Sequence, residues 1–173
     1  MKKIIIFDGP DKCGKTEMAT ELSNRINYPY FKNKSEWDAF EKDPGYFLNA
    51  LKYGDTYFFN YLKQTGSKVI LDRSFPSEWC YSRVFNRSTD EKVLRQVDNL
   101  AAAAGACIII PYRTSYSGIH DDVHEINEQH LKLLSAAYEE FAEWTTCKVL
   151  RLCVDSEDIN YEMNQILSFI MRG

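Results

Sequence analysis

The feature that most constrains this chain is the segment from Gly9 to Thr16, which reads Gly-Pro-Asp-Lys-Cys-Gly-Lys-Thr. It matches the pattern GxxxxGK[ST] and directly follows an apolar run that ends at Asp8. A buried strand, a glycine-containing loop and a helix, in this order, place backbone N–H groups and a helix N-terminus around phosphate oxygens. The segment therefore predicts a phosphate-binding loop made of Gly9, Pro10, Asp11, Lys12, Cys13, Gly14, Lys15 and Thr16.

Two side chains of this loop have expected roles toward a nucleoside triphosphate. Lys15 should reach the β- and γ-phosphates, and Thr16 should supply a hydroxyl that ligates Mg²⁺. The alternative is a chance match in an ordinary strand-to-helix turn. That alternative is disfavoured because strand, loop and helix all occur in the required order.

The remainder of the chain fits one domain over residues 1–173. The composition, 45% apolar and 14% aromatic, supports a sizeable core, and no Pro/Gly/Ser-rich linker divides the chain. No apolar run approaches the ~20 residues of a membrane span, and the N-terminal one is too short for a signal peptide. Five cysteines without CxxC spacing argue against a disulfide framework and favour a reducing cytoplasm. A net charge of −4 gives no case for duplex nucleic acid as a bulk ligand.

Apolar segments alternate with helical patterns along the whole chain. Strands are expected at 4–7, 28–31, 69–71, 107–110 and 149–154. Helices are expected after the phosphate loop, at 35–40, at 47–62, from a Ser88–Glu91 capping box to Ala104, at 126–144 and at 158–172. This alternation predicts an α/β domain with a parallel sheet and helices on both faces.

A second polar constellation, Asp72-Arg73-Ser74, ends the third expected strand. Ligands of open α/β sheets bind at this carboxyl edge, so Asp72 can hold Mg²⁺ or orient the attacking oxygen. Arg73 can grip an anionic group with its planar fork. An Asp–Arg ion pair that only closes a strand is the alternative, and the phosphate loop beside it favours the functional interpretation.

These motifs resemble those of the thymidylate kinase and deoxynucleoside kinase branch of the P-loop kinases. The segment from Asp8 to Thr16 matches the thymidylate kinase pattern throughout. The later Asp-Arg-aromatic motif matches only partly, because Ser74 replaces the aromatic residue and resembles instead the Glu-Arg-Ser motif of deoxynucleoside kinases. The resemblance implies a three-layer P-loop kinase fold, a five-stranded parallel sheet in the order 2-3-1-4-5, and a short lid at about 111–125.

The resemblance also implies an acceptor site. Asp11 would face the acceptor sugar, Lys32 or Lys34 its phosphate, and Phe47 or Leu48 its base, with Lys52 where the family has a base-contacting arginine. The alternatives are that Lys52 is a solvated helix residue, that Phe47 is core, and that the other lysines merely lie on the surface. The acceptor-binding set is thus Asp11, Lys32, Phe47, Lys52, Arg73 and Ser77.

The expected lid has one arginine, Arg113, where many kinases have several. One thymidylate kinase subclass resembles this arrangement and carries a basic residue in the phosphate loop, so Lys12 is expected to neutralise the transferring phosphoryl group. The expected catalytic residues are therefore Lys12, Lys15, Asp72 and Arg73, with Thr16 and Asp72 on the metal. A metal site formed by His120, His124 and His130 is disfavoured because no further ligand is evident.

The sequence and the resemblance together predict a kinase that uses ATP and Mg²⁺ to phosphorylate a pyrimidine deoxynucleotide. Three alternatives stay open: a deoxynucleoside kinase, a 5-hydroxymethyluracil-DNA kinase of the bacteriophage type, and a non-enzymatic nucleotide-binding module. The expected partners are a nucleoside triphosphate and a nucleotide or nucleoside acceptor, with DNA as acceptor and a homodimer also open. No membrane partner is expected.

Overall fold

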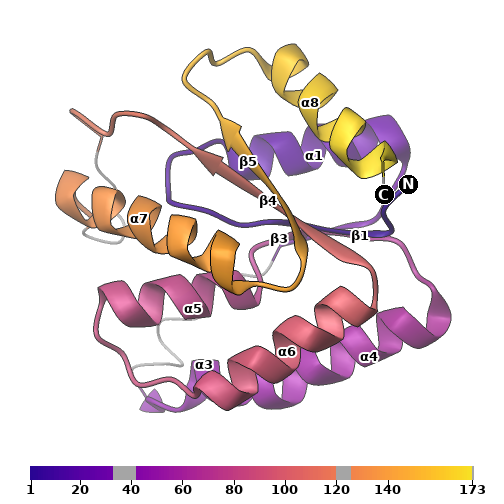
Figure 1. Ribbon diagram of the computed structural model, residues 1–173, viewed down its shortest axis with the longest axis vertical. Helices are drawn as coiled ribbons and strands as arrows, with labels where there is room; N and C mark the ends of the chain where they lie inside the picture. The colour runs from indigo at the N-terminus through magenta and orange to yellow at the C-terminus, as the bar shows by residue number, and fades with distance from the viewer. Residues whose placement is uncertain (33–41, 120–125, 173) are drawn as a thin grey trace.

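The computed structural model describes residues 1–32, 42–119 and 126–172 and has a three-layer α/β architecture (Figure 1). Its sheet has five parallel strands in the order β2-β3-β1-β4-β5. These strands are β1 (Ile4–Phe7), β2 (Tyr30–Lys32), β3 (Val69–Asp72), β4 (Ala106–Tyr112) and β5 (Lys148–Cys153). The expected fold class and strand order are confirmed.

The central strands are hydrophobic because both faces of the sheet are covered. All four residues of β1 are buried, and so are all four of β3. This continuous burial is typical of parallel sheets with helices on both sides. Phe7 lies opposite Asp72 on one side and Ile109 on the other, so β1 and β3 end level with each other. Their carboxyl ends therefore deliver Asp8 and Arg73 to the same place.

Helices cover both faces of the sheet, one group on each side (Figure 1). The first group is α1 (Lys15–Ile26) and α8 (Ile159–Met171). The second group is α4 (Thr56–Thr65), α5 (Phe75–Val84), α6 (Glu91–Ala103) and α7 (Glu128–Trp144). Aromatic edge-to-face contacts of Phe75 with Phe59 and with Phe141 link α4, α5 and α7, at ring-centroid distances of 6.1 and 5.9 Å.

Helix α5 was not predicted, and the start predicted for α6 was wrong. The α5 sequence lacks an amphipathic pattern because most of its residues are buried, so its period is hidden. The N-cap of α6 is Asp90, whose carboxylate accepts from the backbone N–H groups of Lys92 and Val93. The expected cap, Ser88, precedes this turn. The helix expected at 35–40 lies outside the described residues.

The helix expected at 47–62 is built from three pieces. A short α3 (Tyr46–Asn49) leads into a π-helical segment η1 (Ala50–Asp55), and α4 continues from it. The wider turn is visible in the N–H of Thr56, which donates to the carbonyl of Leu51, five residues earlier. A π turn holds more residues than an α turn, so it rotates the preceding residues about the helix axis. Leu51 is buried as a result, and Lys52 is exposed.

Across residues 1–32, 42–119 and 126–172, no helix has the length and apolar character that a membrane crossing requires. The two ends of the chain lie close together (Figure 1), and the N–H of Lys2 donates to the carbonyl of Ile170 at 2.9 Å.

Candidate active site

Two glycines allow the phosphate loop to take its shape. A Cβ on Gly9 would lie 2.9 Å from the carbonyl oxygen of Pro111, so a side chain there would collide with the end of β4. Gly14 is the N-cap of α1 and has a φ of 68°, in the left-handed region that glycine adopts without strain. The loop therefore passes close to the sheet and turns sharply into the helix.

Lys15 lies inside this loop and is buried. Its ammonium donates to the carbonyl oxygen of Pro10 at 2.5 Å. Burial, and secondarily the charge of Arg73, lowers the pKa of Lys15 to about 8. An anionic phosphate beside this ammonium would favour its charged form, so the loop holds a cation that gains from an anionic ligand.

A polar cluster joins the loop to β2 and β3. The hydroxyl of Thr16 donates to the Asp72 carboxylate at 2.6 Å, and the hydroxyl of Tyr30 donates to the same oxygen at 2.9 Å. The ammonium of Lys32 lies 3.1 Å from the Thr16 hydroxyl and 3.8 Å from the Asp72 carboxylate. A cation thus already stands against the two oxygens expected to hold Mg²⁺, and such oxygen donors suit that ion. The residues present fit a magnesium site.

Asp8 organises the junction between β1 and α5. Its carboxylate is fully buried and accepts from the backbone N–H groups of Gly9, Ser74 and Ser77 at 2.9 to 3.2 Å. It also accepts from the hydroxyls of Ser77 and Tyr138, at 2.7 and 2.6 Å. A buried carboxylate needs such a set of donors, and this one holds the phosphate loop against the start of α5.

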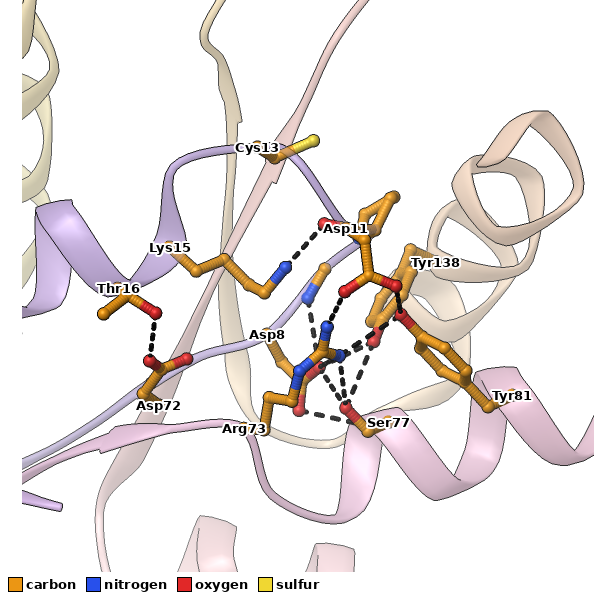
Figure 2. A network of polar contacts seen from close by, with 12 residues as sticks. Asp8, Asp11, Cys13, Lys15, Thr16, Asp72, Arg73, Ser77, Tyr81 and Tyr138 are labelled. Atoms are coloured by element: carbon orange, nitrogen blue, oxygen red, sulfur yellow. Dashed lines mark hydrogen bonds and ion pairs between the residues drawn. The ribbon is translucent and has the colours of Figure 1, made fainter. Parts of the chain in front are cut away.

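Arg73 connects the phosphate loop to α5 (Figure 2). Its guanidinium forms an ion pair with Asp11 and donates to the hydroxyls of Ser77 and Tyr81 at 3.1 and 3.3 Å. Tyr81 in turn donates to Asp11 at 2.6 Å. Burial raises the pKa of the Tyr81 hydroxyl well above its usual value, which keeps it a donor. Arg73 has a φ of 71°, a strained conformation that is common at functional sites.

These groups border one cavity of about 700 Å³. The phosphate loop, β2 and β3 line one part of it, and α3, η1 and α5 line the rest. Most of the site residues expected from the sequence lie on its wall, namely Asp11, Lys12, Cys13, Gly14, Lys15, Thr16, Lys32, Phe47, Asp72, Arg73 and Ser77. Sites predicted far apart in the sequence are therefore brought together.

Four expected residues do not line this cavity, namely Lys52, Arg113, Gly9 and Pro10. Lys52 is exposed, with its ammonium 5.4 Å from the centre of the Tyr53 ring, because the π turn of η1 rotates it outward. Arg113 donates to the backbone carbonyl of Lys12 at 3.0 Å and pairs with Glu157 at 3.1 Å. Arg113 therefore braces the phosphate loop from behind. Gly9 and Pro10 are buried on the same inner side of the loop.

Within residues 1–32, 42–119 and 126–172, no three His, Cys, Asp or Glu side chains form a group that could hold a metal ion. His130 lies on α7 with its ring 5.1 Å from that of Phe85. His120 and His124 lie outside the described residues.

Sequence reasoning missed four residues that belong to the site. Tyr30 and Tyr81 bind the site carboxylates, and Tyr138 reaches Asp8 from α7. The signal for Tyr81 was its spacing of four from Ser77, which required α5 to be recognised as a helix. Asp55 lines the cavity from η1, and no sequence motif marks it as part of a site.

Comparison with known proteins identifies the fold of this chain. No protein-family model matches the sequence, and no curated protein matches it. Solved structures do match: YorR from Bacillus subtilis is 22% identical, with a TM-score of 0.68, over 98% of this chain and 95% of its own. The chain has the P-loop kinase fold.

Two further P-loop kinase structures cover nearly all of this chain. A deoxyadenosine kinase from M. mycoides is 20% identical with a TM-score of 0.58, over 98% of this chain and all of its own. Thymidylate kinase from Candida albicans is 16% identical with a TM-score of 0.62, over 99% of this chain and 92% of its own. The resemblance seen in the sequence motifs thus extends to the whole architecture.

Proposed function

We propose that this protein is an ATP- and Mg²⁺-dependent kinase that transfers the γ-phosphoryl group to a pyrimidine deoxynucleotide. The observation that carries the proposal is the single cavity in which the phosphate loop faces Arg73, Ser77 and Phe47. A donor site and an acceptor site must open into one space for direct transfer, because the reacting oxygens have to meet.

On the donor side, the backbone N–H groups of the loop and the ammonium of Lys15 would bind the β- and γ-phosphates. Thr16 and Asp72 would hold Mg²⁺, which supplies neutralisation of phosphate charge when it is bound. Tyr30 keeps the Asp72 carboxylate oriented toward Thr16. Lys32 would have to leave its present contacts for the ion to bind, and it could then face the acceptor phosphate.

On the acceptor side, Arg73 would hold and orient the acceptor, with Asp11 facing its sugar. The contacts of Arg73 with Asp11, Ser77 and Tyr81 fix the plane of the guanidinium before any ligand binds. Lys12, exposed at the tip of the loop with a φ of 61°, would neutralise the developing charge at the transition state. Arg113 would contribute through the loop backbone.

Nucleotides bound to proteins of the same fold support a nucleotide-sized acceptor site. The YorR structure is a complex with phosphorylated GDP, and one deoxyadenosine kinase structure holds dCMP and dCDP. The cavity here is about 700 Å³, within the usual range for small-molecule sites.

A labelled-phosphate assay tests the proposal directly. The purified protein is incubated with γ-labelled ATP, Mg²⁺ and, separately, deoxynucleoside monophosphates, deoxynucleosides and DNA with hydroxymethylated bases. Transfer to a pyrimidine monophosphate, abolished in Lys15→Ala, is the expected result. ATP binding without transfer to any acceptor would instead favour a nucleotide-binding module.

A second candidate acceptor is a hydroxyl, as in a deoxynucleoside kinase or a DNA-base kinase. The observation that favours it is the charge balance around Arg73, which already pairs with Asp11 and lies 4.0 Å from the Asp8 carboxylate. A neutral acceptor needs no free cation there. The same assay separates the two, because only the deoxynucleosides or the DNA would then accept the label.

A further inference from the structure

The wall that α3 and η1 give to the cavity is mostly apolar. It consists of Tyr46, Phe47, Ala50, Leu51 and Asp55, so one carboxyl group stands among two aromatic and two aliphatic side chains. Ligand sites are usually lined by apolar and aromatic side chains with a few polar groups that fix the orientation of the ligand. In a nucleotide or nucleoside acceptor, the base has flat faces that pack on such a wall and a polar edge that a polar group can bind.

Asp55 stands on this wall one helical turn after Leu51. In η1 the residue that shares the inner face with Leu51 is Asp55, and the backbone bond from Thr56 to the Leu51 carbonyl closes the wide turn between them. Single π turns inside helices occur frequently at functional sites. Here the turn brings Leu51 to the cavity and leaves Lys52 outside.

No hydrogen bond or ion pair joins Asp55 to another residue within 1–32, 42–119 and 126–172. Burial, and then the charge of Asp8, raises the pKa of Asp55 to about 7. A partly buried carboxyl group without a protein donor is destabilising, so its position is best explained by a donor that arrives with a ligand.

A second carboxyl group faces the same cavity from α5. Glu78 is 7% exposed, and one of its oxygens is bound by Arg87 at 2.7 Å. Its other oxygen, Oε1, is buried and has no hydrogen-bond partner in the described parts of the chain. Because Oε1 of Glu78 is buried within the protein, Asp55 is the carboxyl group at this end of the cavity that a ligand can reach.

We infer that Asp55 is a specificity-determining residue that selects an acceptor base with an exocyclic amino group, cytosine rather than thymine or uracil in the pyrimidine series. This inference rests on the proposed kinase function and deepens it. A carboxylate accepts a hydrogen bond from N4 of cytosine, as Asp and Glu do when they read that base in nucleic acids. Uracil and thymine present a carbonyl oxygen at the same place, and two acceptors repel each other.

The test compares acceptors that differ only in this group. Transfer rates are measured for deoxycytidine against deoxyuridine and for dCMP against dUMP, and calorimetry follows binding of each ligand with the donor site filled by a non-hydrolysable ATP analogue and Mg²⁺. The wild type is expected to favour cytosine by about tenfold or more in kcat/KM and in affinity.

Two variants locate the effect at Asp55. Asp55→Asn keeps the shape of the side chain but adds an N–H₂ donor that can bind O4 of uracil. The kcat/KM and the affinity are therefore expected to rise for the uracil ligands. Asp55→Ala removes the hydrogen-bond acceptor, so the kcat/KM and the affinity are expected to fall for the cytosine ligands. Glu143→Gln, which removes a charge from an exposed position on α7, is the matched control and should keep the wild-type ratio.

The outcomes separate the inference from the proposed function. Equal transfer to cytosine and uracil acceptors, or the same ratio in Asp55→Asn as in the wild type, overturns the assignment of Asp55 and leaves the kinase intact. Binding that favours cytosine without transfer to any acceptor removes the kinase and leaves the assignment standing. Absence of binding by all four ligands overturns both.

Discussion

The guanidinium of Arg73 pairs with the carboxylate of Asp11, so the turn between β3 and α5 is tied to the middle of the phosphate loop. The two motifs that stand far apart in the sequence are joined by hydrogen bonds and an ion pair at the carboxyl edge of β1 and β3. A substitution in either motif is therefore expected to alter the side-chain positions in the other.

Replacing Arg73 tests which acceptor this unit holds. Arg73→Met is expected to raise the KM for a monophosphate acceptor by about tenfold or more, because a charge-assisted contact to the phosphate is lost. The KM for ATP should change by less than about threefold. Steady-state kinetics with varied acceptor measures both, with Arg151→Met on the exposed edge of β5 as control. An unchanged acceptor KM with a lower kcat would assign a hydroxyl acceptor instead.

Lys12 and Arg113 are expected to differ in their effects. Lys12→Ala should lower kcat by about 10²-fold with little change in ATP affinity, because its contact would form mainly in the transition state. Arg113→Ala should cost less, since Arg113 holds the loop through the carbonyl of Lys12. Single-turnover rates and ATP titrations of both variants check this order. A larger loss of kcat in Arg113→Ala than in Lys12→Ala would assign the catalytic role to Arg113 of the expected lid.

Lys32 is expected to compete with the metal ion in the nucleotide-free protein. Its ammonium contacts Thr16 and Asp72, so Lys32→Met should tighten Mn²⁺ binding by about three- to tenfold through the loss of a like charge. Electron paramagnetic resonance of free Mn²⁺ measures the affinity without any turnover. Lys63→Met, at an exposed position on α4, is the control. Equal affinities in Lys32→Met and the wild type would contradict the prediction.

The raised pKa of Asp55 predicts that the free energy of unfolding depends on pH. Its pKa is raised from 3.8 to about 7, so the folded protein binds more protons than the unfolded chain between these values. The free energy of unfolding therefore falls as the pH rises through this window. Above the window, Asp55 is charged and its destabilising effect on the folded protein is complete. Asp55→Asn should raise the Tm by about 3–6 °C at pH ~8 and leave it nearly unchanged at pH ~4. Thermal melts at both pH values check this, and a gain that is equal at the two would refute it.

Asp8 is expected to be the most sensitive of the buried polar residues. Asp8→Asn turns one acceptor into a donor that faces the N–H and O–H groups of Gly9, Ser74, Ser77 and Tyr138. The expected loss is about 2–4 kcal/mol of unfolding free energy, measured by urea denaturation. Ser77→Ala removes one donor and should cost about 1 kcal/mol. A smaller loss in Asp8→Asn than in Ser77→Ala would contradict the role of Asp8.

The phosphate loop was predictable because its chemistry lies in one contiguous segment. Gly14, Lys15 and Thr16 each have a role fixed by their place in that segment, and the strand before it is buried on both faces. The sheet was predictable as well, since apolar strands alternate with helices along the chain.

The contacts between distant residues were not predictable in the same way. Tyr138 and Asp8 are 130 positions apart, and nothing near either residue indicates that they meet. The position of Lys52 failed for another reason. Its expected role rested on its position relative to the resembled family, and a sequence position does not show that the helix takes a π turn at η1.

Because of the π turn, the number of residues in η1 determines which side chains line the cavity. Deleting one residue from η1, such as the exposed Gly54, whose removal leaves no packed side chain behind, would let the segment wind as an ordinary α-helix. The residues before it would rotate by about 100°. The sheet and the phosphate loop would stay where they are, while a different side chain would line the cavity. A new lining of this cavity thus needs no new amino acid, only one fewer.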